Sequence, residues 1–446
     1  MLGIMIQVRL LHEGGFFLSS KEDSMLGTEV GLFSKSFIKF KLKEICLAEN
    51  GIQTGPFGSQ LHMSDYVEVG TPIITVEHLV DGFISHINLP LVSDYDRERL
   101  KKYSLKKGDI IISRVGSVDR SAIVGESEEG WLFSGRCIRV RPDESKVNSR
   151  YVAWFLQHPS VKEYLRRVAV GLSMPSLNTK IIENVPIYVN PNEKWQESSA
   201  NLLDNINSAV EINRRNGILS QEIIESIFRS WFIDFDPVKA KVEGNIPYGM
   251  NQEIAALFPD SFEESELGLL PSGWKIGRIG DMANISSGKH QPKRLVERSN
   301  EYSTPLLGGT GIIGWTDESL FNEPIIVTGR VGTLGVVKKY IHPVYPSDNT
   351  LVFKTKKPSS FHYLYYQLKL QDFGAYNRGS TQPLISQSDM KKLKIIIPNN
   401  DVLLAFEEKI RPIVLFSLLI EEKCKSLAKT RDLLLPRLMS GELKVN

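Results

Sequence analysis

Hydrophobic and polar positions along the 446-residue chain have the spacing of strands in some segments and of helices in others. The same order of strand-like and helix-like segments occurs twice. Each half begins with short apolar runs broken by Gly and Ser, a pattern typical of strands and turns. A short segment with helical spacing follows, and a long amphipathic stretch closes each half. The predicted strands are 110–112, 122–124 and 137–141, then 325–327, 336–337 and 350–354. The predicted short helices are 151–167 and 361–376.

The long amphipathic stretches have the three-and-four spacing of a coiled-coil seam. A helix with one apolar stripe must bury that stripe, so the two long helices are each other's expected partners, in antiparallel orientation. Pro412 predicts a kink or a late start of the second helix. The seam of the second helix is Leu403, Phe406, Ile410, Ile413, Ser417, Ile420, Cys424, Leu427, Arg431, Leu434 and Leu438. The first helix approximates it with Leu203, Ile206, Val210, Ile224, Ile227 and Trp231.

An internal duplication accounts for this recurrence. Similar short segments lie at two nearly equal offsets, which indicates a tandem repeat with a small deletion in the second copy. Several separate matches at one offset are unexpected by chance. The matched pairs are Arg114 with Arg330 at an offset of 216 residues, and Pro175 with Pro383, 185–189 with 393–397, and Arg229 with Arg437 at an offset of 208.

Composition narrows the class of protein. With 41% hydrophobic and 24% charged residues, the chain has ordinary globular composition, and its length predicts two or three domains. The net charge of +2 neither requires nor excludes a polyanionic partner, so a DNA-binding surface must come from local clustering. Three widely spaced cysteines, Cys46, Cys137 and Cys424, favour reduced thiols in a cytoplasmic protein. We find no apolar run of membrane-spanning length and no methylase, nucleotide-binding or metal-binding motif.

Three segments carry a resemblance to a known family. They are ESIFRSWFIDFDPVKAK at 225–241, LLLPRLMSGEL at 433–443 and GLLPSGWK at 268–275. All three closely resemble the conserved segments of Type I restriction-modification specificity subunits. The resemblance extends over nearly the whole chain from about residue 37, and it is specific in the long helices and weak in the strand-rich regions.

The resemblance implies an α/β (α+β) fold in which two long antiparallel coiled-coil helices separate two tandem target recognition domains, with a pseudo-twofold internal repeat. The expected organisation is an N-terminal extension of unclear role at 1–36, recognition domain 1 at 37–190, the first long helix at 191–235, a linker at 236–270, recognition domain 2 at 271–398, the second long helix at 399–440 and a tail at 441–446.

The resemblance also implies a function. Each recognition domain reads one half of a bipartite double-stranded DNA target, and the helices set the spacer between the halves and dock two modification (methyltransferase) subunits. Restriction subunits, which are ATP-dependent translocases and nucleases, join through that complex. The chain is expected to be non-catalytic and to carry no cofactor of its own, because S-adenosylmethionine and ATP belong to the partner subunits. It is expected in the cytoplasm.

Candidate DNA-binding residues come from the repeated loops. Arg114 and Arg330 each follow an apolar strand and precede Val-Gly, and arginine is the commonest side chain for guanine contacts and phosphate clamps. Because they recur, we expect them to grip the DNA backbone, and a surface salt bridge is the structural alternative. Gly/Ser/Pro loops supply the remaining candidates, for which turn chemistry or a scaffold role is the alternative. These are Gln53, Ser59, Ser117, Ser173, Ser176, Asn178, Lys289, His290, Gln291, Arg378, Ser380 and Gln382.

The ends of the long helices supply candidates for partner docking. Phe228, Trp231 and Phe232 form a dense aromatic group beside Arg229, and Arg437 is the repeat equivalent of Arg229. Aromatic residues are enriched at interfaces, so a docking surface for the modification subunit is one interpretation. The other, which we place first for the aromatic side chains, is that they cap the core of the coiled coil.

Other functions remain open at the level of sequence. One is a DNA-targeting subunit of a related methylation or phage-defence system that lacks restriction. Another is a protein-only scaffold, which would show no sequence-specific binding to DNA. A self-contained restriction or methylation enzyme is a third, and it would need a catalytic motif that we do not find.

Overall fold

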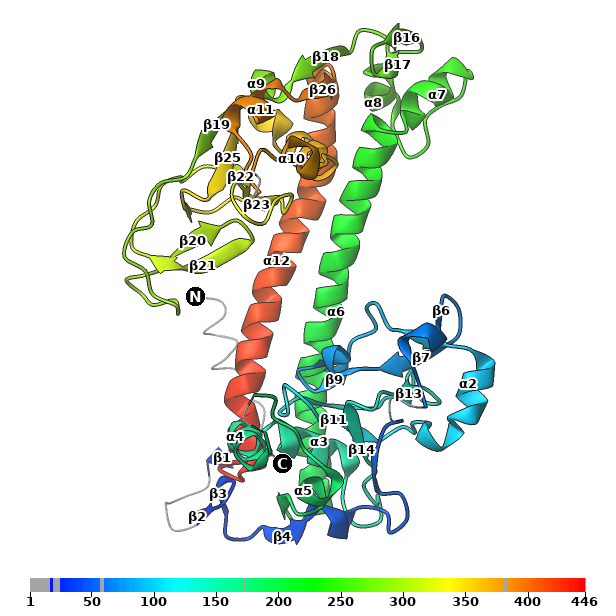
Figure 1. Ribbon diagram of the computed structural model, residues 1–446, viewed down its shortest axis with the longest axis vertical. Coiled ribbons are helices and arrows are strands. Elements are labelled where there is room, and N and C mark those ends of the chain that lie inside the picture. Colours follow the sequence, from blue (N-terminus) through cyan, green and yellow to red (C-terminus); the bar gives the residue numbers. More distant parts are fainter. Residues whose placement is uncertain (1–16, 19–24, 57–59, 172, 380–382, 446) are drawn as a thin grey trace. The chain divides into compact units, whose positions relative to one another are not determined.

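The computed structural model describes residues 17–18, 25–56, 60–171, 173–379 and 383–445. The chain divides into two compact units, and two 40-residue helices, α6 (Glu193–Phe232) and α12 (Asn400–Met439), contribute to both. Unit 1 comprises the described residues of 1–213 and 422–446, and unit 2 comprises those of 214–421. We call the strand-rich part of unit 1 that precedes α6 head 1, and the strand-rich part of unit 2 between α6 and α12 head 2 (Figure 1).

Head 1 is built from short strands and a few short helices. Its strands, with the C-terminal β27, are β1 (Phe17–Leu18), β2 (Met25–Thr28), β3 (Gly31–Ser34), β4 (Ile38–Lys41), β5 (Ile52–Thr54), β6 (Tyr66–Val67), β7 (Thr71–Ile74), β8 (Leu79–Val80), β9 (Phe83–Ile84), β10 (Leu91–Val92), β11 (Ile110–Ser113), β12 (Ser121–Ile123), β13 (Leu132–Phe133), β14 (Cys137–Val140), β15 (Pro186–Val189) and β27 (Leu443–Lys444). Its helices are η2 (Leu42–Ile45), η3 (Met63–Asp65), η4 (Val76–His78), α2 (Asp94–Arg99), η5 (Lys101–Tyr103), α3 (Ser149–Gln157), α4 (Pro159–Val168) and α5 (Thr179–Glu183).

Unit 2 repeats this plan with slightly longer strands. The strands are β16 (Phe262–Ser265), β17 (Gly268–Pro271), β18 (Lys275–Arg278), β19 (Ala283–Ser287), β20 (Thr304–Gly308), β21 (Gly311–Thr316), β22 (Ile325–Gly329), β23 (Lys338–Tyr340), β24 (Tyr345–Pro346), β25 (Thr350–Thr355) and β26 (Lys394–Ile397). The helices are α7 (Asp236–Val242), α8 (Gln252–Ala256), α9 (Ile279–Met282), η6 (Pro358–Ser360), α10 (Phe361–Lys369), η7 (Phe373–Tyr376) and α11 (Gln387–Lys392).

The sheet topology confirms the internal repeat. Strand order β12-β11-β14-β5 in head 1 matches β23-β22-β25-β19 in head 2, and neighbouring strands are antiparallel in both. A second sheet in each head contains one parallel pair, β7 with β13 and β20 with β24. The pairs β4–β15 and β18–β26 also correspond. The mixed α/β fold with two repeated domains is therefore the one that the sequence predicts.

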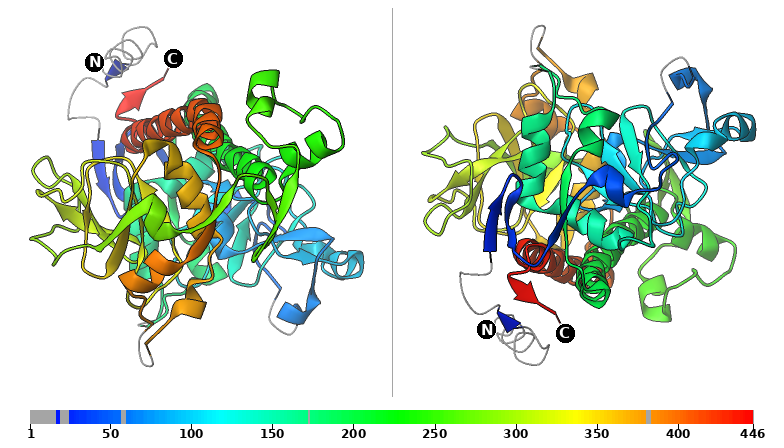
Figure 2. Two further views of the ribbon diagram at one scale, coloured as in Figure 1. Left: turned by 90° about the horizontal axis from the view of Figure 1, so that it is seen from above. Right: turned by 90° about the horizontal axis from the view of Figure 1, so that it is seen from below.

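The hairpin β2–β3 extends the repeat towards the N-terminus. It corresponds to the hairpin β16–β17, and in both a side-chain hydroxyl, of Thr28 or Ser265, donates to the carbonyl of a glycine three residues on. Val30 and Phe33 are almost fully buried in the core of unit 1. In the same unit β1 pairs with β27, so the first and last described strands lie side by side (Figure 2).

The long helices pack against each other with the predicted seam. In unit 1, Asn207 contacts Arg431, and the Cys424 thiol donates to the carbonyl of Val210. In unit 2, Gln221 donates to Ser417. Phe228 and Phe406 are ring neighbours in that unit. Because numbers rise along α6 as they fall along α12, the segments are antiparallel in each unit. All seam positions of α12 are buried or half-buried.

Four local expectations need correction, and one is the helix expected at 361–376, because α10 ends at Lys369 and the short η7 covers only Phe373–Tyr376. The helix expected at 151–167 is two helices, because Pro159 removes one backbone donor and disfavours helical geometry at His158, whose ψ is 132°. The strand expected at 336–337 is β23, which begins two residues later, at Lys338. A late start of the second helix at Pro412 is wrong, because α12 is continuous from Asn400 to Met439.

Candidate DNA interface

Arg114 and Arg330 stand at equivalent places in the two heads. Each follows the central strand of its sheet, β11 or β22, and is half-buried. The main-chain N–H of Arg114 donates to the carbonyl of Arg136 (N···O 2.8 Å), and that of Arg330 donates to the carbonyl of Asn349 (2.8 Å). The repeat detected in the sequence is thus a repeat of backbone hydrogen bonding.

A second loop packs against each arginine. The carbonyl of Arg114 accepts from the N–H of Leu177, and the carbonyl of Arg330 accepts from the N–H of Ile385. Two residues after each arginine, a glycine donates to the carbonyl of Pro175 or of Pro383. Two sequence matches with different offsets, 216 and 208 residues, therefore meet at one place in each head.

The Gly-rich loops complete the arrangement, and both need glycine. A Cβ on Gly55 would stand 2.2 Å from the carbonyl oxygen of Ser134, and one on Gly288 would stand 2.2 Å from that of Ser347. The N–H of each glycine donates to the carbonyl of the residue that begins the neighbouring strand of the sheet, Cys137 in β14 or Thr350 in β25. We call these gathered loops the four-loop face: 54–56, 114–117, 134–136 and 173–177 in head 1, and 287–291, 330–333, 347–349 and 378–379 with 383–385 in head 2.

The arginine side chains contact these loops. The Nη1 of Arg114 donates to the carbonyl of Gly135 (3.4 Å), and the Nη1 of Arg330 donates to the hydroxyl of Ser287 (3.3 Å). The Nε of Arg330 is buried without a hydrogen-bond partner among the described residues, and no described carboxylate pairs with this guanidinium. For Arg330 the salt-bridge alternative is therefore not supported.

The other predicted residues of head 1 divide between surface and scaffold. Ser117 and Ser173 are exposed. Ser176 donates to the carbonyl of Val170, and Asn178 caps α5 by accepting from the N–H of Ile181 (2.9 Å). The last two side chains thus have structural partners. The Oε1 of Gln53 is buried without a partner among the described residues.

Head 2 shows the same division. Lys289 and His290 are exposed, and Gln291 lines a cavity of about 390 Å³ beside Gly332. Arg378 forms an ion pair with Asp389, the surface salt bridge that is the structural alternative for an arginine. The predicted residues Ser59, Ser380 and Gln382 lie outside the described residues.

The aromatic residues near the end of α6 form a core. Phe228, Trp231 and Phe232 are at most 4% exposed and pack against the ring of Phe406 at centroid distances of 5.0–6.2 Å. With so little exposed surface, these three side chains fit the interpretation placed first for them, that they cap the core of the coiled coil. Their docking role stays a prediction.

The two helix-end arginines are equivalent, and Arg229 is exposed whereas Arg437 is half-buried. Arg229 pairs with Asp234 (3.3 Å) and Arg437 with Glu442 (3.0 Å), each with an acidic residue five positions on. Their surfaces remain accessible in the described part of the chain, and a docking role for them stays a prediction.

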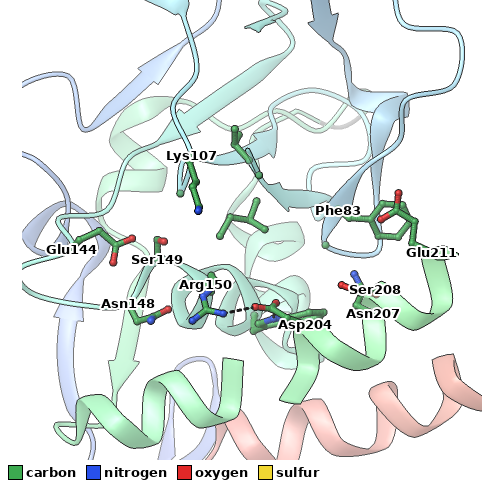
Figure 3. Close-up of a pocket in the computed structure, with 16 residues that line it drawn as sticks. Phe83, Lys107, Glu144, Asn148, Ser149, Arg150, Asp204, Asn207, Ser208 and Glu211 are labelled. Carbon is green, nitrogen blue, oxygen red and sulfur yellow. Dashed lines mark hydrogen bonds and ion pairs between the residues drawn. The ribbon is translucent and has the colours of Figure 1, made fainter. Parts of the chain in front are cut away.

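A cavity of about 680 Å³ lies between head 1 and α6 (Figure 3). Asp204 on α6 receives hydrogen bonds from Arg150 (3.1 Å) and from the indole of Trp154 (2.7 Å). Lys107 and Glu211 also line it, so both signs of charge are present. None of the predicted DNA-binding residues lines this cavity, and its mixed charge does not favour a polyanion.

The described residues were also searched for metal-binding groups, reactive thiols and membrane-spanning helices. Among them no group of three or more His, Cys, Asp or Glu side chains is placed to hold a metal ion. The three cysteines are free thiols, and burial raises the pKa of both Cys46 and Cys137 to about 12, so neither is a nucleophile near neutral pH. No described helix is long and apolar enough to span a membrane.

The family is shown by comparison with known proteins. The model of the Type I restriction modification DNA specificity domain matches residues 35–220 and 271–403, once in each copy of the repeat. The chain therefore belongs to this family and is a specificity subunit of a Type I restriction-modification system, the non-catalytic member of such a complex.

Individual relatives are similar over most of their length. The chain is 25% identical to the Type I restriction enzyme MjaIX specificity subunit of Methanocaldococcus jannaschii, over 94% of this chain and 96% of that one. It is 22% identical to the HindI specificity subunit of Haemophilus influenzae, over 77% and 88%. A crystal structure of an S subunit from M. genitalium has the same fold, with a TM-score of 0.56, 14% identity and coverage of 90% and 96%.

Proposed function

We propose that each head reads one half of a bipartite double-stranded DNA target through its four-loop face. The observation that carries this proposal is the repeated arrangement in which an arginine, a close-packed glycine loop and a Gly/Ser/Pro loop meet in both heads. Arginine supplies bidentate donors to phosphate, and glycine lets the main chain approach a groove closely. Contacts made in the same way by both heads suit the phosphate backbone, which is the same in any half-site.

In this proposal the paired long helices set the spacer between the half-sites and dock two modification subunits. Arg229 and Arg437 are the candidates for docking, since they recur at equivalent helix ends and their side chains are accessible. Restriction subunits join through the modification subunits, and S-adenosylmethionine and ATP belong to those partners, not to this chain. The complex works in the cytoplasm, where it meets DNA.

Sequencing of modified bases tests the proposed function. Cells that contain the modification subunits are compared with and without this chain. We expect a two-part motif with an unread spacer to be modified only when the chain is present. A continuous motif, or modification that does not depend on the chain, would contradict the proposal.

A further inference from the structure

Arg136 and Asn349 occupy one equivalent position in the two heads. Each lies two residues after a buried serine, Ser134 or Ser347, in the turn that enters the strand β14 or β25. Neither was singled out by the sequence patterns. Their equivalence rests on the hydrogen bonds of the turn, which are the same in both heads.

The main chain of this turn is held from three sides. In head 2 the N–H of Ser347 donates to the carbonyl of Leu307 (2.9 Å), and the N–H of Thr350 donates back to Ser347 (3.0 Å). The carbonyl of Asn349 itself accepts from Arg330. Head 1 has the same three bonds at 2.8–2.9 Å. These bonds fix the main chain and therefore the direction in which the side chain leaves it, which recognition of a base edge requires.

Both side chains are exposed and uncommitted. Neither Arg136 nor Asn349 forms a side-chain hydrogen bond or an ion pair with another residue in the described ranges. By contrast, Arg378 and Asn178 are engaged by an ion pair and a helix cap. Polar groups on a rigid turn without internal partners are available to a ligand.

The chemistry at this position differs between the heads. An arginine guanidinium matches the O6 and N7 of guanine, whereas an asparagine or glutamine carboxamide matches the N6 and N7 of adenine. Asn349 shares its cavity with a second carboxamide, that of Gln291. Gly308 and Gly309, which follow Leu307, line this cavity too. In head 1 the turn residue Ser134 donates to Ile74 as Ser347 does to Leu307, so Thr75 and Val76 correspond to these two glycines.

We propose that this turn position determines specificity in each half-site, with Arg136 reading a guanine and Asn349, together with Gln291, reading an adenine. The proposal rests on the function proposed above and adds the residues that distinguish the two half-sites. The recurring arginines grip the DNA backbone, and the variable turn position reads a base.

Selection from a duplex library tests this assignment. The full chain, assembled with its modification subunits, is incubated with duplexes in which both half-sites are randomised, and the bound fraction is sequenced. Arg136→Ala should reduce the preference for guanine at one position of one half-site by about tenfold, and Asn349→Ala should do the same for adenine in the other. All other positions should keep their preferences.

Two further variants separate base reading from other roles. Arg136→Lys keeps the charge but loses the planar fork, so it should lose the guanine preference as Arg136→Ala does. Exposed residues outside the face, Arg97 and Asn300, provide matched alanine controls that should leave the selected motif unchanged. Melting curves establish that each variant folds.

The outcomes are distinct. An unchanged motif in Arg136→Ala and Asn349→Ala would overturn the assignment. So would a uniform loss of affinity that Arg136→Lys restores, because that pattern indicates a phosphate contact. If the unaltered complex selects no two-part motif, the proposed function itself fails.

Discussion

Single residues show where sequence patterns are sufficient and where they are not. Arg114 and Arg330 were predicted because a short motif around them recurs, and the structure gives them equivalent hydrogen bonds. Arg136 and Asn349 were missed because they share no residue type, and only their main chains are equivalent. The sequence left two interpretations of Trp231 open, because an aromatic residue at helical spacing has the same pattern in a core as at an interface, and the side chain is buried.

The recurring arginines predict a loss of affinity that is independent of sequence. Arg114→Ala and Arg330→Ala should each weaken DNA binding, and the slope of log affinity against log salt should become shallower by about one. Titrations of the assembled complex at several salt concentrations measure both quantities. Ser287→Ala is a useful control, since it removes the hydroxyl that accepts from Arg330 and Gln387 but no charge, and it should leave the salt slope unchanged. Unaltered affinity in both arginine variants would contradict the phosphate role.

Lys339 in head 2 predicts a pH-dependent stability. Burial lowers the pKa of its ammonium group to about 8, and its Nζ lies 5.0 Å from the ring centre of Tyr365 without a hydrogen-bond partner among the described residues. Below pH 8 the lysine is protonated in both folded and unfolded chains, so its burial penalty is fully present. Between about pH 8 and the unfolded pKa near 10.4, only the unfolded chain keeps the proton, so stability rises with pH.

The matching experiment is thermal melting of Lys339→Met at several pH values. The variant should melt above the unaltered protein at pH 7, and the difference should shrink between pH 8 and pH 10. Lys338→Met, at the exposed neighbouring position, should show no such trend. A difference that grows with pH would have the wrong sign for this account.

At the scale of elements, periodicity predicted two long helices, and α6 and α12 are each 40 residues long, because the seam must remain buried over many turns. The repeat also predicted one plan for both halves, and the strand order of the two heads corresponds. Short strands and turns were placed less well, since a two-residue strand carries no period of its own. The break between α3 and α4 had a signal in Pro159, but the apolar pattern continues across it.

The Gly-rich loops predict strict limits on substitution. Gly55→Ala and Gly288→Ala should each destabilise the protein by about 1–3 kcal/mol and weaken DNA binding, because the new methyl group meets a main-chain oxygen. Chemical denaturation measures the first effect. Gly27→Ala is the control, since no atom stands within 4 Å of its Cβ position, and its effect should stay within about 0.5 kcal/mol. Equal stability of all three variants would show that the loops tolerate a side chain.

The polar pair in the helix seam predicts non-additive effects. The Nη1 of Arg431 donates to Asn207 (2.7 Å), and the guanidinium is buried in unit 1. Asn207→Leu alone should cost about 1–3 kcal/mol, because it removes an acceptor from a buried charge. Adding Arg431→Leu should recover most of that loss, since the apolar pair suits the seam. Urea unfolding of Asn207→Leu, Arg431→Leu and the double variant completes a double-mutant cycle. Additive losses of unfolding free energy would contradict a direct coupling between the two side chains.

At the scale of the whole molecule, the duplication explains why one chain has two heads that share a scaffold but differ in side chains. Family and fold followed from the helices, whose sequence is constrained by packing. The four-loop faces could not be predicted to the same depth, because their loops carry no period. Heads with separate cores and separate four-loop faces should read DNA independently, with contributions that are roughly additive.

Exchange of one head tests this independence most directly. Residues 271–398 are replaced with the matching segment of a family relative, and the motif modified by the assembled complex is determined by sequencing. The account predicts that one half of the motif changes to that of the relative while the other half stays the same. A change in both halves, or in neither, would contradict the claim that each head reads its own half-site.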